Sequence, residues 1–183
     1  PLAIFKKLTL PKSPVHIVRR ITPTQQESLI IAAKGCRSQY MAPLILFALE
    51  TAMRRGELLN LTWEDIDLSN NELLIRQTKN GHQRLLPLSP KAIQILDNLP
   101  RHNSGRVFPL SAGAVRQSFT RLRLRAELPN IRFHDLRHEA ISRCFEKGLT
   151  IIEVGQISGH RNLSQTLHYG HTNHTITKLK LKV

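Results

Sequence analysis

Near the start of the chain stands QYMAPLILFALETAM, residues 39–53, which is apolar on nearly every side when it is wound as a helix. A helix of that kind is buried rather than laid on a surface, so we predict that it lies in the middle of the fold. Its longest apolar run, Met41–Leu49, stops at Glu50 and is too short to cross a bilayer. We therefore expect a core helix of a globular domain and no membrane partner.

The segments on either side of this helix are predicted to be helical as well. Pro23 suits a first helical position after Thr22, and Gln25 stands where a capping box needs it, so a helix is expected to begin there. A shorter helix is expected from about Arg55 to Leu61. Residues 1–20 carry prolines among basic residues and show no sustained period, which indicates a linker.

Two short strands are predicted next, Glu72–Gln77 and Gln83–Leu88. The segment between them, TKNGH (78–82), contains Asn-Gly, a strong signal for a tight turn between antiparallel strands. The rest of the chain is predicted to be mainly helical, so the expected fold class is mainly α with a small antiparallel β-sheet (α+β). The further helices are expected from Ser89-Pro90 to about Leu99, Ala112 to Glu127, Phe133 to Lys147 with Gly148 as its cap, and Ile151 to Ile157.

The charge balance of the sequence is unusual. Its 183 residues include 27 Lys and Arg against 13 Asp and Glu, a formal net charge of +14. A compact domain this basic repels itself until a polyanion neutralises it, and nucleic acid is the commonest such partner. A basic surface that only keeps the protein soluble is the plainer alternative. Cys36 and Cys144 belong to no regular framework, which favours a reduced, cytosolic protein.

Two pairs of side chains could bind a phosphate group. His134 and Arg137 stand one helical turn apart, where a guanidinium offers a planar fork of donors and an imidazole can move a proton near neutral pH. Arg54 directly follows core residues, and Glu57, one turn later, could orient its guanidinium. Each pair also has a plainer interpretation, the first as a solvated helix surface and the second as an ordinary intrahelical ion pair.

Lys79 and Tyr169 are the remaining candidates. Lys79 lies at the tip of the predicted hairpin, where it could give a proton to a leaving oxygen, although a solvent-exposed turn lysine is commoner. Tyr169 lies in a polar, histidine-rich stretch, whereas the other tyrosine, Tyr40, begins the core helix and is expected to be structural. A phenol becomes a nucleophile only when donors or a base assist it.

The nine histidines raise the question of zinc. His134 and His138 stand four residues apart, but the chain has no HExxH pattern there, and Arg137 would repel a cation bound between them. No metal site is therefore predicted.

The order and spacing of these candidates resemble those of the tyrosine recombinase (phage integrase) family. TAMRRGELLNLTWEDID (51–67) is similar to the box around the family's first arginine, and RQTKNGHQRLLPL (76–88) to its lysine hairpin. HDLRH (134–138) is similar to the H-x-x-R box, and ISGHRNLSQTLHY (157–169) to the G-H box with the nucleophile nine residues later. The resemblance extends over residues 21–172 and implies six catalytic positions: Arg54, Lys79, His134, Arg137, His160 and Tyr169.

The resemblance implies the recombinase catalytic-domain fold and a site-specific enzyme that cleaves and rejoins DNA through a 3′-phosphotyrosine at Tyr169. Arg54 and Arg137 would stabilise the phosphoryl group, and His160 would donate a further hydrogen bond to it. Lys79 would protonate the departing 5′ oxygen, and His134 would act as a base toward the phenol. Glu57 would hold a neighbouring group in place. Neither a metal nor another cofactor is implied.

Double-stranded DNA is the implied partner, on which family members form homotetramers, while a monomer remains open for the isolated domain. Residues 1–20 would be the remnant of an interdomain linker, and the basic tail 173–183 could dock on a neighbouring subunit. We expect a cytoplasmic, nucleoid-associated protein of bacterial or phage origin. Two other functions remain open: a type IB topoisomerase and a non-catalytic DNA-binding protein with the same fold.

Two positions depart from the family's usual pattern. Ala52 stands where the family usually has glycine, and Glu139 stands where a small or hydroxyl residue is more common. Neither is one of the six catalytic positions, so we expect both to bear on local packing.

Overall fold

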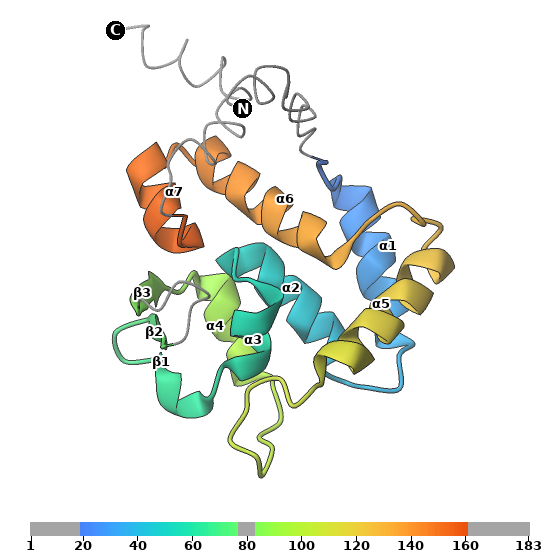
Figure 1. Ribbon diagram of the computed structural model, residues 1–183, viewed down its shortest axis with the longest axis horizontal. Helices are drawn as coiled ribbons and strands as arrows, with labels where there is room; N and C mark the ends of the chain where they lie inside the picture. Colours follow the sequence, from blue (N-terminus) through green and yellow to red (C-terminus); the bar gives the residue numbers. More distant parts are fainter. Residues whose placement is uncertain (1–18, 77–82, 161–183) are drawn as a thin grey trace, which may run out of the picture.

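Helices surround one central helix and flank a small antiparallel sheet (Figure 1). The computed structural model describes residues 19–76 and 83–160. The fold class expected from the sequence is confirmed. In chain order the elements are α1 (Pro23–Lys34), α2 (Met41–Thr51), α3 (Arg55–Asn60), the 3-10 helix η2 (Trp63–Asp65), β1 (Ile66–Asp67), β2 (Glu72–Ile75), β3 (Arg84–Pro87), α4 (Pro90–Asp97), α5 (Ala112–Arg125), α6 (Phe133–Glu146) and α7 (Ile151–Ser158).

Helix α2 forms the centre of the hydrophobic core, as its sequence predicts. It packs against α1, α4 and α6. Leu44, Ile45 and Phe47 are completely buried, and the Phe47 ring lies 5.6 Å from the Phe108 ring in a tilted pair. None of the helices among the described residues is long and apolar enough to span a membrane.

The start of α1 and the end of α2 show how local chemistry sets where a helix begins and ends. The Thr22 side chain accepts a hydrogen bond from the Gln25 N–H, so the predicted capping box at the start of α1 is confirmed. Helix α2 stops at Thr51 because Ala52 adopts a left-handed conformation with φ 53°. Glycine enters that region without steric cost, which explains why the family pattern favours glycine at this position.

The sheet has three strands in the order β1-β2-β3, with Leu73 opposite Leu86 and Ile75 opposite Arg84. Strands β2 and β3 confirm the two predicted strands, and the turn that carries Lys79 lies outside the described residues. Strand β1 was not predicted, because two residues are too few to show an alternating pattern. Leu73 and Leu86 are buried, so this face of the sheet packs on the core.

Helix α7 joins the sheet to the long helix α6. It packs on both α6 and β3, and α6 in turn lies along α2 (Figure 1). Gly148 (φ 86°) follows α6 as the predicted cap, and Gly159 (φ 69°) ends α7. The carboxyl end of α7 therefore lies close to the turn between α2 and α3, where Arg54 begins the next helix.

Candidate active site

Arg54 caps the amino-terminal end of α3 and is fixed on two sides. Its backbone N–H donates to Glu57 Oε2 at 2.9 Å, and its Nη1 donates to Glu57 Oε1 at 2.9 Å. On the other side, Nη2 donates to the carbonyl oxygen of Gly159 at 3.0 Å. Glu57 thus orients Arg54 as the sequence suggested, and the side chain stays 28% exposed, so a ligand can reach it.

Arg137 is buried within α6, at 3% exposure, although helical spacing alone indicates a polar surface. Its Nη1 donates to the carbonyl oxygen of Ala52, and its Nη2 donates to that of Ser158 at 2.7 Å. These carbonyls belong to the ends of α2 and α7, which close over α6. The guanidinium is therefore held by two backbone oxygens whose positions are fixed by the fold.

His160 directly follows Gly159 and brings its imidazole against Arg137. Its Nε2 lies 3.2 Å from Arg137 Nη2, and its Nδ1 lies 2.9 Å from Ser158 Oγ. Burial first, and then the charges of Arg137 and Arg54, lower the pKa of His160 from 6.5 to about 4. The ring is thus neutral at pH 7, and both contacts fit a tautomer whose Nδ1–H donates to Ser158 while Nε2 accepts from Arg137.

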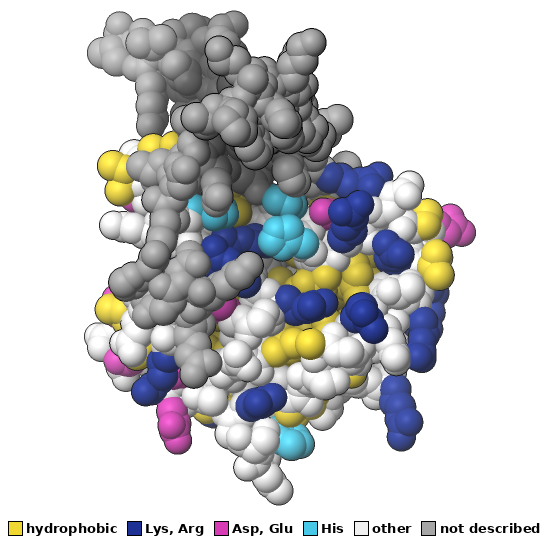
Figure 2. Space-filling view, in the orientation of Figure 1, with side chains coloured by type: hydrophobic (Ala, Val, Ile, Leu, Met, Phe, Trp, Pro, Cys, Tyr) yellow, Lys and Arg dark blue, Asp and Glu magenta, His cyan; other side chains and the backbone are white. Residues whose placement is uncertain are grey.

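His134 and His138 complete a cluster of imidazoles on this face. Their rings meet edge-on with centroids 4.6 Å apart, one turn apart on α6. Both also contribute to lowering the pKa of His160, so the three rings lie near one another. Figure 2 shows histidine side chains beside Lys and Arg side chains on one face of the molecule. Among the described residues, no three His, Cys, Asp or Glu side chains are grouped to hold a metal ion.

One further arginine joins this arrangement that the sequence did not single out. Arg84, the first residue of β3, donates from both terminal nitrogens to the two oxygens of Glu57, at 3.1 and 2.9 Å. Its signal was available in the sequence, since strand alternation places it on the same face as the buried Leu86. A charged group on a buried face needs an opposite charge, and Glu57 provides it.

Glu57 is the common partner of two arginines and is 7% exposed. Burial by itself would raise the pKa of its carboxyl group, but the hydrogen bonds and charge of Arg84, together with hydrogen bonds from Arg54, lower the pKa overall. The group is therefore a carboxylate at neutral pH.

The two remaining predicted catalytic residues, Lys79 and Tyr169, lie outside the described residues. The structural role expected for Tyr40 is supported: its ring is buried, and its hydroxyl donates to the carbonyl oxygen of Pro100 at 3.4 Å. Four of the six predicted positions, Arg54, His134, Arg137 and His160, are thus brought into one neighbourhood.

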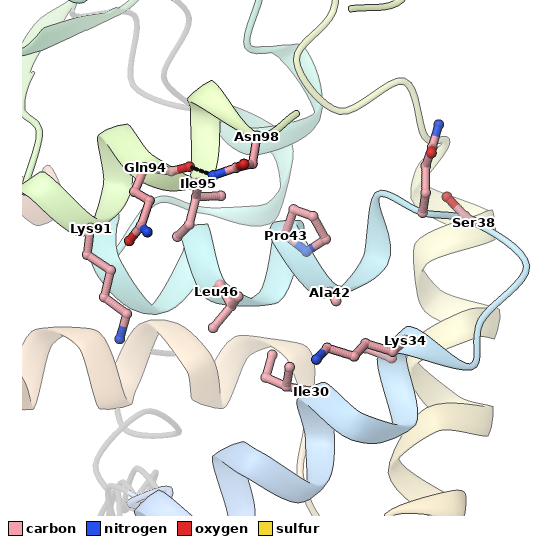
Figure 3. Close-up of a pocket in the computed structure, with 12 residues that line it drawn as sticks. Ile30, Lys34, Ser38, Ala42, Pro43, Leu46, Lys91, Gln94, Ile95 and Asn98 are labelled. Atoms are coloured by element: carbon pink, nitrogen blue, oxygen red, sulfur yellow. Dashed lines mark hydrogen bonds between the residues drawn. The ribbon is translucent and has the colours of Figure 1, made fainter. Parts of the chain in front are cut away.

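An apolar groove lies between α1, α2 and α4, apart from these residues. Leu46 and Ile95 line it, and Lys34 and Lys91 flank it (Figure 3). None of the candidate catalytic residues contributes to it. It offers little for phosphate chemistry, which needs converging donors, so the arginine and histidine cluster remains the candidate site.

Comparison with known proteins finds relatives that are named recombinases or integrases. A shufflon-specific DNA recombinase of Escherichia coli is 40% identical over 156 residues, which are 84% of this chain and 40% of that protein. A putative integrase/recombinase of Haemophilus influenzae is 36% identical over 175 residues, 87% of this chain and 46% of that protein. The chain thus spans less than half the length of these curated relatives.

Solved structures show the same fold. The catalytic domain of bacteriophage HP1 integrase matches with a TM-score of 0.72 and 25% identity, over 90% of this chain and 95% of that one. The Tn1549 transposon integrase, solved in complex with circular intermediate DNA, matches with a TM-score of 0.69 and 23% identity, over 86% of this chain and 63% of that one. The model of the phage integrase family matches residues 19–175, and this chain belongs to that family of tyrosine recombinases.

Proposed function

We propose that this chain is the catalytic part of a site-specific recombinase that cleaves and rejoins double-stranded DNA through a covalent phosphotyrosine at Tyr169. The observation that carries the proposal is the meeting of Arg54, Arg137 and His160 at the carboxyl end of α7. Two guanidinium groups and an imidazole in one place suit a single phosphate group.

The two arginines would bind the non-bridging oxygens of the scissile phosphate. A guanidinium has five N–H donors, of which Arg54 uses two in its side-chain contacts to Glu57 and Gly159, while Arg137 is held by the carbonyl oxygens of Ala52 and Ser158. These contacts fix both guanidinium groups before DNA binds. The guanidinium groups would therefore stabilise the charge that develops on the phosphorane without having to reorganise.

His160 would change hydrogen-bonding role when DNA binds. In the structure its Nε2 fits the role of acceptor from Arg137. An anionic phosphate beside it would raise its pKa and favour a proton on Nε2, which could then donate to the phosphate. The Ser158 hydroxyl can either accept from Nδ1 or donate to it, so it supports both tautomers.

The chemical step follows from these positions and from the family motifs. The phenol oxygen of Tyr169 would attack phosphorus, forming the 3′-phosphotyrosine bond as the bond to the 5′ oxygen breaks. His134 would accept the phenol proton, and Lys79 would supply a proton to the 5′ oxygen. Attack by the freed 5′ hydroxyl of a partner strand reverses these transfers, so the energy of the phosphodiester bond is conserved. The two arginines and Lys79 would supply positive charge for the reaction.

Several observations favour DNA as substrate. The net charge of +14 suits a polyanion. The matched relatives are named recombinases and integrases, and the matched Tn1549 integrase was solved with DNA. These names favour strand exchange over supercoil relaxation, and we propose that the complete protein assembles as a homotetramer on synapsed duplexes.

A trapped covalent complex tests the proposal. In a pool of nicked duplexes with a randomised core, cleavage releases the short fragment that carries the freed 5′ hydroxyl. Religation is then prevented, so protein–DNA adducts accumulate and are seen on a denaturing gel. We expect an adduct with the wild-type chain and none with Tyr169→Phe, which lacks the attacking oxygen. The recovered adducts also provide a defined cleavage sequence for kinetic work.

Binding must be measured alongside cleavage. Tyr169→Phe should retain wild-type affinity for DNA in a gel-shift assay, because the hydroxyl contributes to the chemistry rather than to charge neutralisation. Arg54→Ala should reduce the cleavage rate by roughly 10²–10³-fold, by analogy with the loss of an oxyanion donor. An adduct that persists in Tyr169→Phe would refute the assignment of the nucleophile.

A further inference from the structure

Arg84 occupies an unusual place for an arginine in a short strand. It begins β3 on the face that packs inward, and its side chain is only 13% exposed. The next residue, Leu85, is 60% exposed on the opposite face. The strand therefore turns its charged residue toward the core and its apolar neighbour toward solvent, which reverses the usual pattern and needs a specific partner.

The contacts of Arg84 connect three elements. Its two terminal nitrogens bind both oxygens of Glu57 on α3 in a two-pronged ion pair, and its Nε donates to the carbonyl oxygen of Ile157 on α7 at 3.2 Å. Paired contacts of this kind restrict both distance and orientation. Since Glu57 also binds Arg54, a change at Arg84 reaches Arg54 through one carboxylate.

The end of α7 receives three arginines on three consecutive carbonyl oxygens. Arg84 binds that of Ile157, Arg137 that of Ser158, and Arg54 that of Gly159. A helix carboxyl end carries partial negative charge, which favours cations there. Arg84 also lies against Gly159, where a Cβ atom would come within 2.8 Å of its Nη1. Its guanidinium thus packs directly beneath the backbone that leads into His160.

We propose that Arg84 is a positioning residue for DNA cleavage, which holds Glu57 and the end of α7 so that Arg54 and His160 keep their geometry around the phosphate. This inference rests on the proposed recombinase function. Arg84 does not itself bind the phosphate, because it is largely buried and both its charge and its Nε are engaged within the protein. It acts through Glu57 and through the Gly159 backbone.

A purely structural ion pair would lower stability but leave the cleavage rate of the folded protein unchanged. Two substitutions separate these roles. Arg84→Met removes the charge and keeps the bulk, whereas Arg84→Lys keeps the charge but cannot bind two carboxylate oxygens and a carbonyl at once. Arg143→Met is the matched control, because Arg143 is also largely buried, at 25% exposure, and pairs with a buried carboxylate, that of Glu139, rather than with Glu57.

The rate of adduct formation is measured at saturating DNA, together with the Kd for DNA, on protein shown to be folded by circular dichroism. We expect both Arg84 variants to lose cleavage rate, on the order of 10²-fold for Arg84→Met, since misplacing a catalytic group by about 1 Å has that effect. The Kd should stay near the wild-type value. Folded Arg143→Met should cleave at close to the wild-type rate.

The pH profile supplies a second measurement. Arg84 makes the largest contribution to keeping the pKa of the buried Glu57 carboxyl group low. In Arg84→Met the carboxylate should gain a proton at higher pH, so the cleavage rate should begin to fall at a higher pH on acidification. In Arg84→Lys, which retains a positive charge, this fall should stay closer to that of the wild type.

The outcomes separate this inference from the proposed function. No adduct with the wild-type chain would remove the proposed function and this inference with it. A wild-type adduct with unchanged rates in folded Arg84→Met would remove this inference alone. An effect confined to the Kd, an equal loss in Arg143→Met, or the failure of both Arg84 variants to fold would likewise overturn a positioning role.

Discussion

His160 is neutral in the folded protein because it is partly buried and lies among positive charges, and this couples the stability of the fold to pH. Burial, followed by the charges of Arg137 and Arg54, lowers its pKa from 6.5 to about 4. Between these two values the unfolded chain binds a proton that the folded chain does not. The free energy of unfolding therefore decreases as the pH falls from about 6.5 to about 4.

We expect His160→Gln to remove this part of the acid sensitivity. In the wild type, the contribution of His160 between neutral pH and the folded-state pKa should be on the order of 1–3 kcal/mol, allowing for partial exposure of the ring. Urea unfolding over a series of pH values measures it. His102→Gln is the control, since that ring is exposed and its hydrogen-bond partner is the nearby Ser104. A wild-type pH dependence in His160→Gln would show that folding does not lower the pKa of His160.

At the scale of an element, α6 uses its other face to bind the segment before α1. Glu139 is 2% exposed and accepts hydrogen bonds from Arg20 Nε (2.8 Å), the Ile21 N–H (2.9 Å) and Arg143 Nε (2.8 Å). Burial would raise the pKa of this carboxyl group, but these donors lower it overall. The unusual acid at this position is therefore the centre of a polar cluster that fixes where the chain enters the domain.

Removing Glu139 should be costly for stability because several donors would lose their shared acceptor. We expect Glu139→Ala to lower the free energy of unfolding by about 3–5 kcal/mol, as for other buried charges left without a partner. Glu146→Ala is the matched control: Glu146 also pairs with Arg20, but it is 46% exposed, so its loss should cost about 1 kcal/mol or less. Equal effects of the two substitutions would show that the cluster contributes no more than a surface pair.

The sequence predicts the elements of this fold better than it predicts their contacts. The capping residues of α1 and the apolar pattern of α2 are local signals, and both predictions are confirmed. The burial of Arg137 could not be predicted, because it arises when the ends of α2 and α7, distant in sequence, close over α6. The partners of Arg84 depend on the same kind of packing, although strand alternation could have indicated an inward charge at this position.

At the scale of the whole molecule, arginines outside the candidate site are also held by backbone carbonyl oxygens. Arg19 donates to the carbonyl oxygen of Asn130 at 2.8 Å, Arg123 to that of Ile131 at 3.1 Å, and Arg125 to that of Ala32 at 3.1 Å. These contacts use neutral acceptors, so each guanidinium keeps its full charge. These positive charges are thus held at fixed positions, where they contribute to a field that attracts a polyanion.

This arrangement predicts DNA binding that is strongly sensitive to salt. If binding neutralises at least six phosphates, affinity for a duplex should fall on the order of 10³-fold or more between about 50 and about 200 mM salt, because released counterions drive association. A gel-shift titration at several salt concentrations gives the slope of log affinity against log salt. Arg54→Ala should make that slope shallower by about one, the loss of one phosphate contact.

Lys91→Ala removes a charge that pairs with Glu50 beside the apolar groove, and should leave the slope unchanged. A wild-type slope shallower than about −3 would limit the contacts to about three phosphates. The net charge would then serve solubility rather than recognition, and the clustered arginines would have to bind their phosphate without help from the rest of the surface.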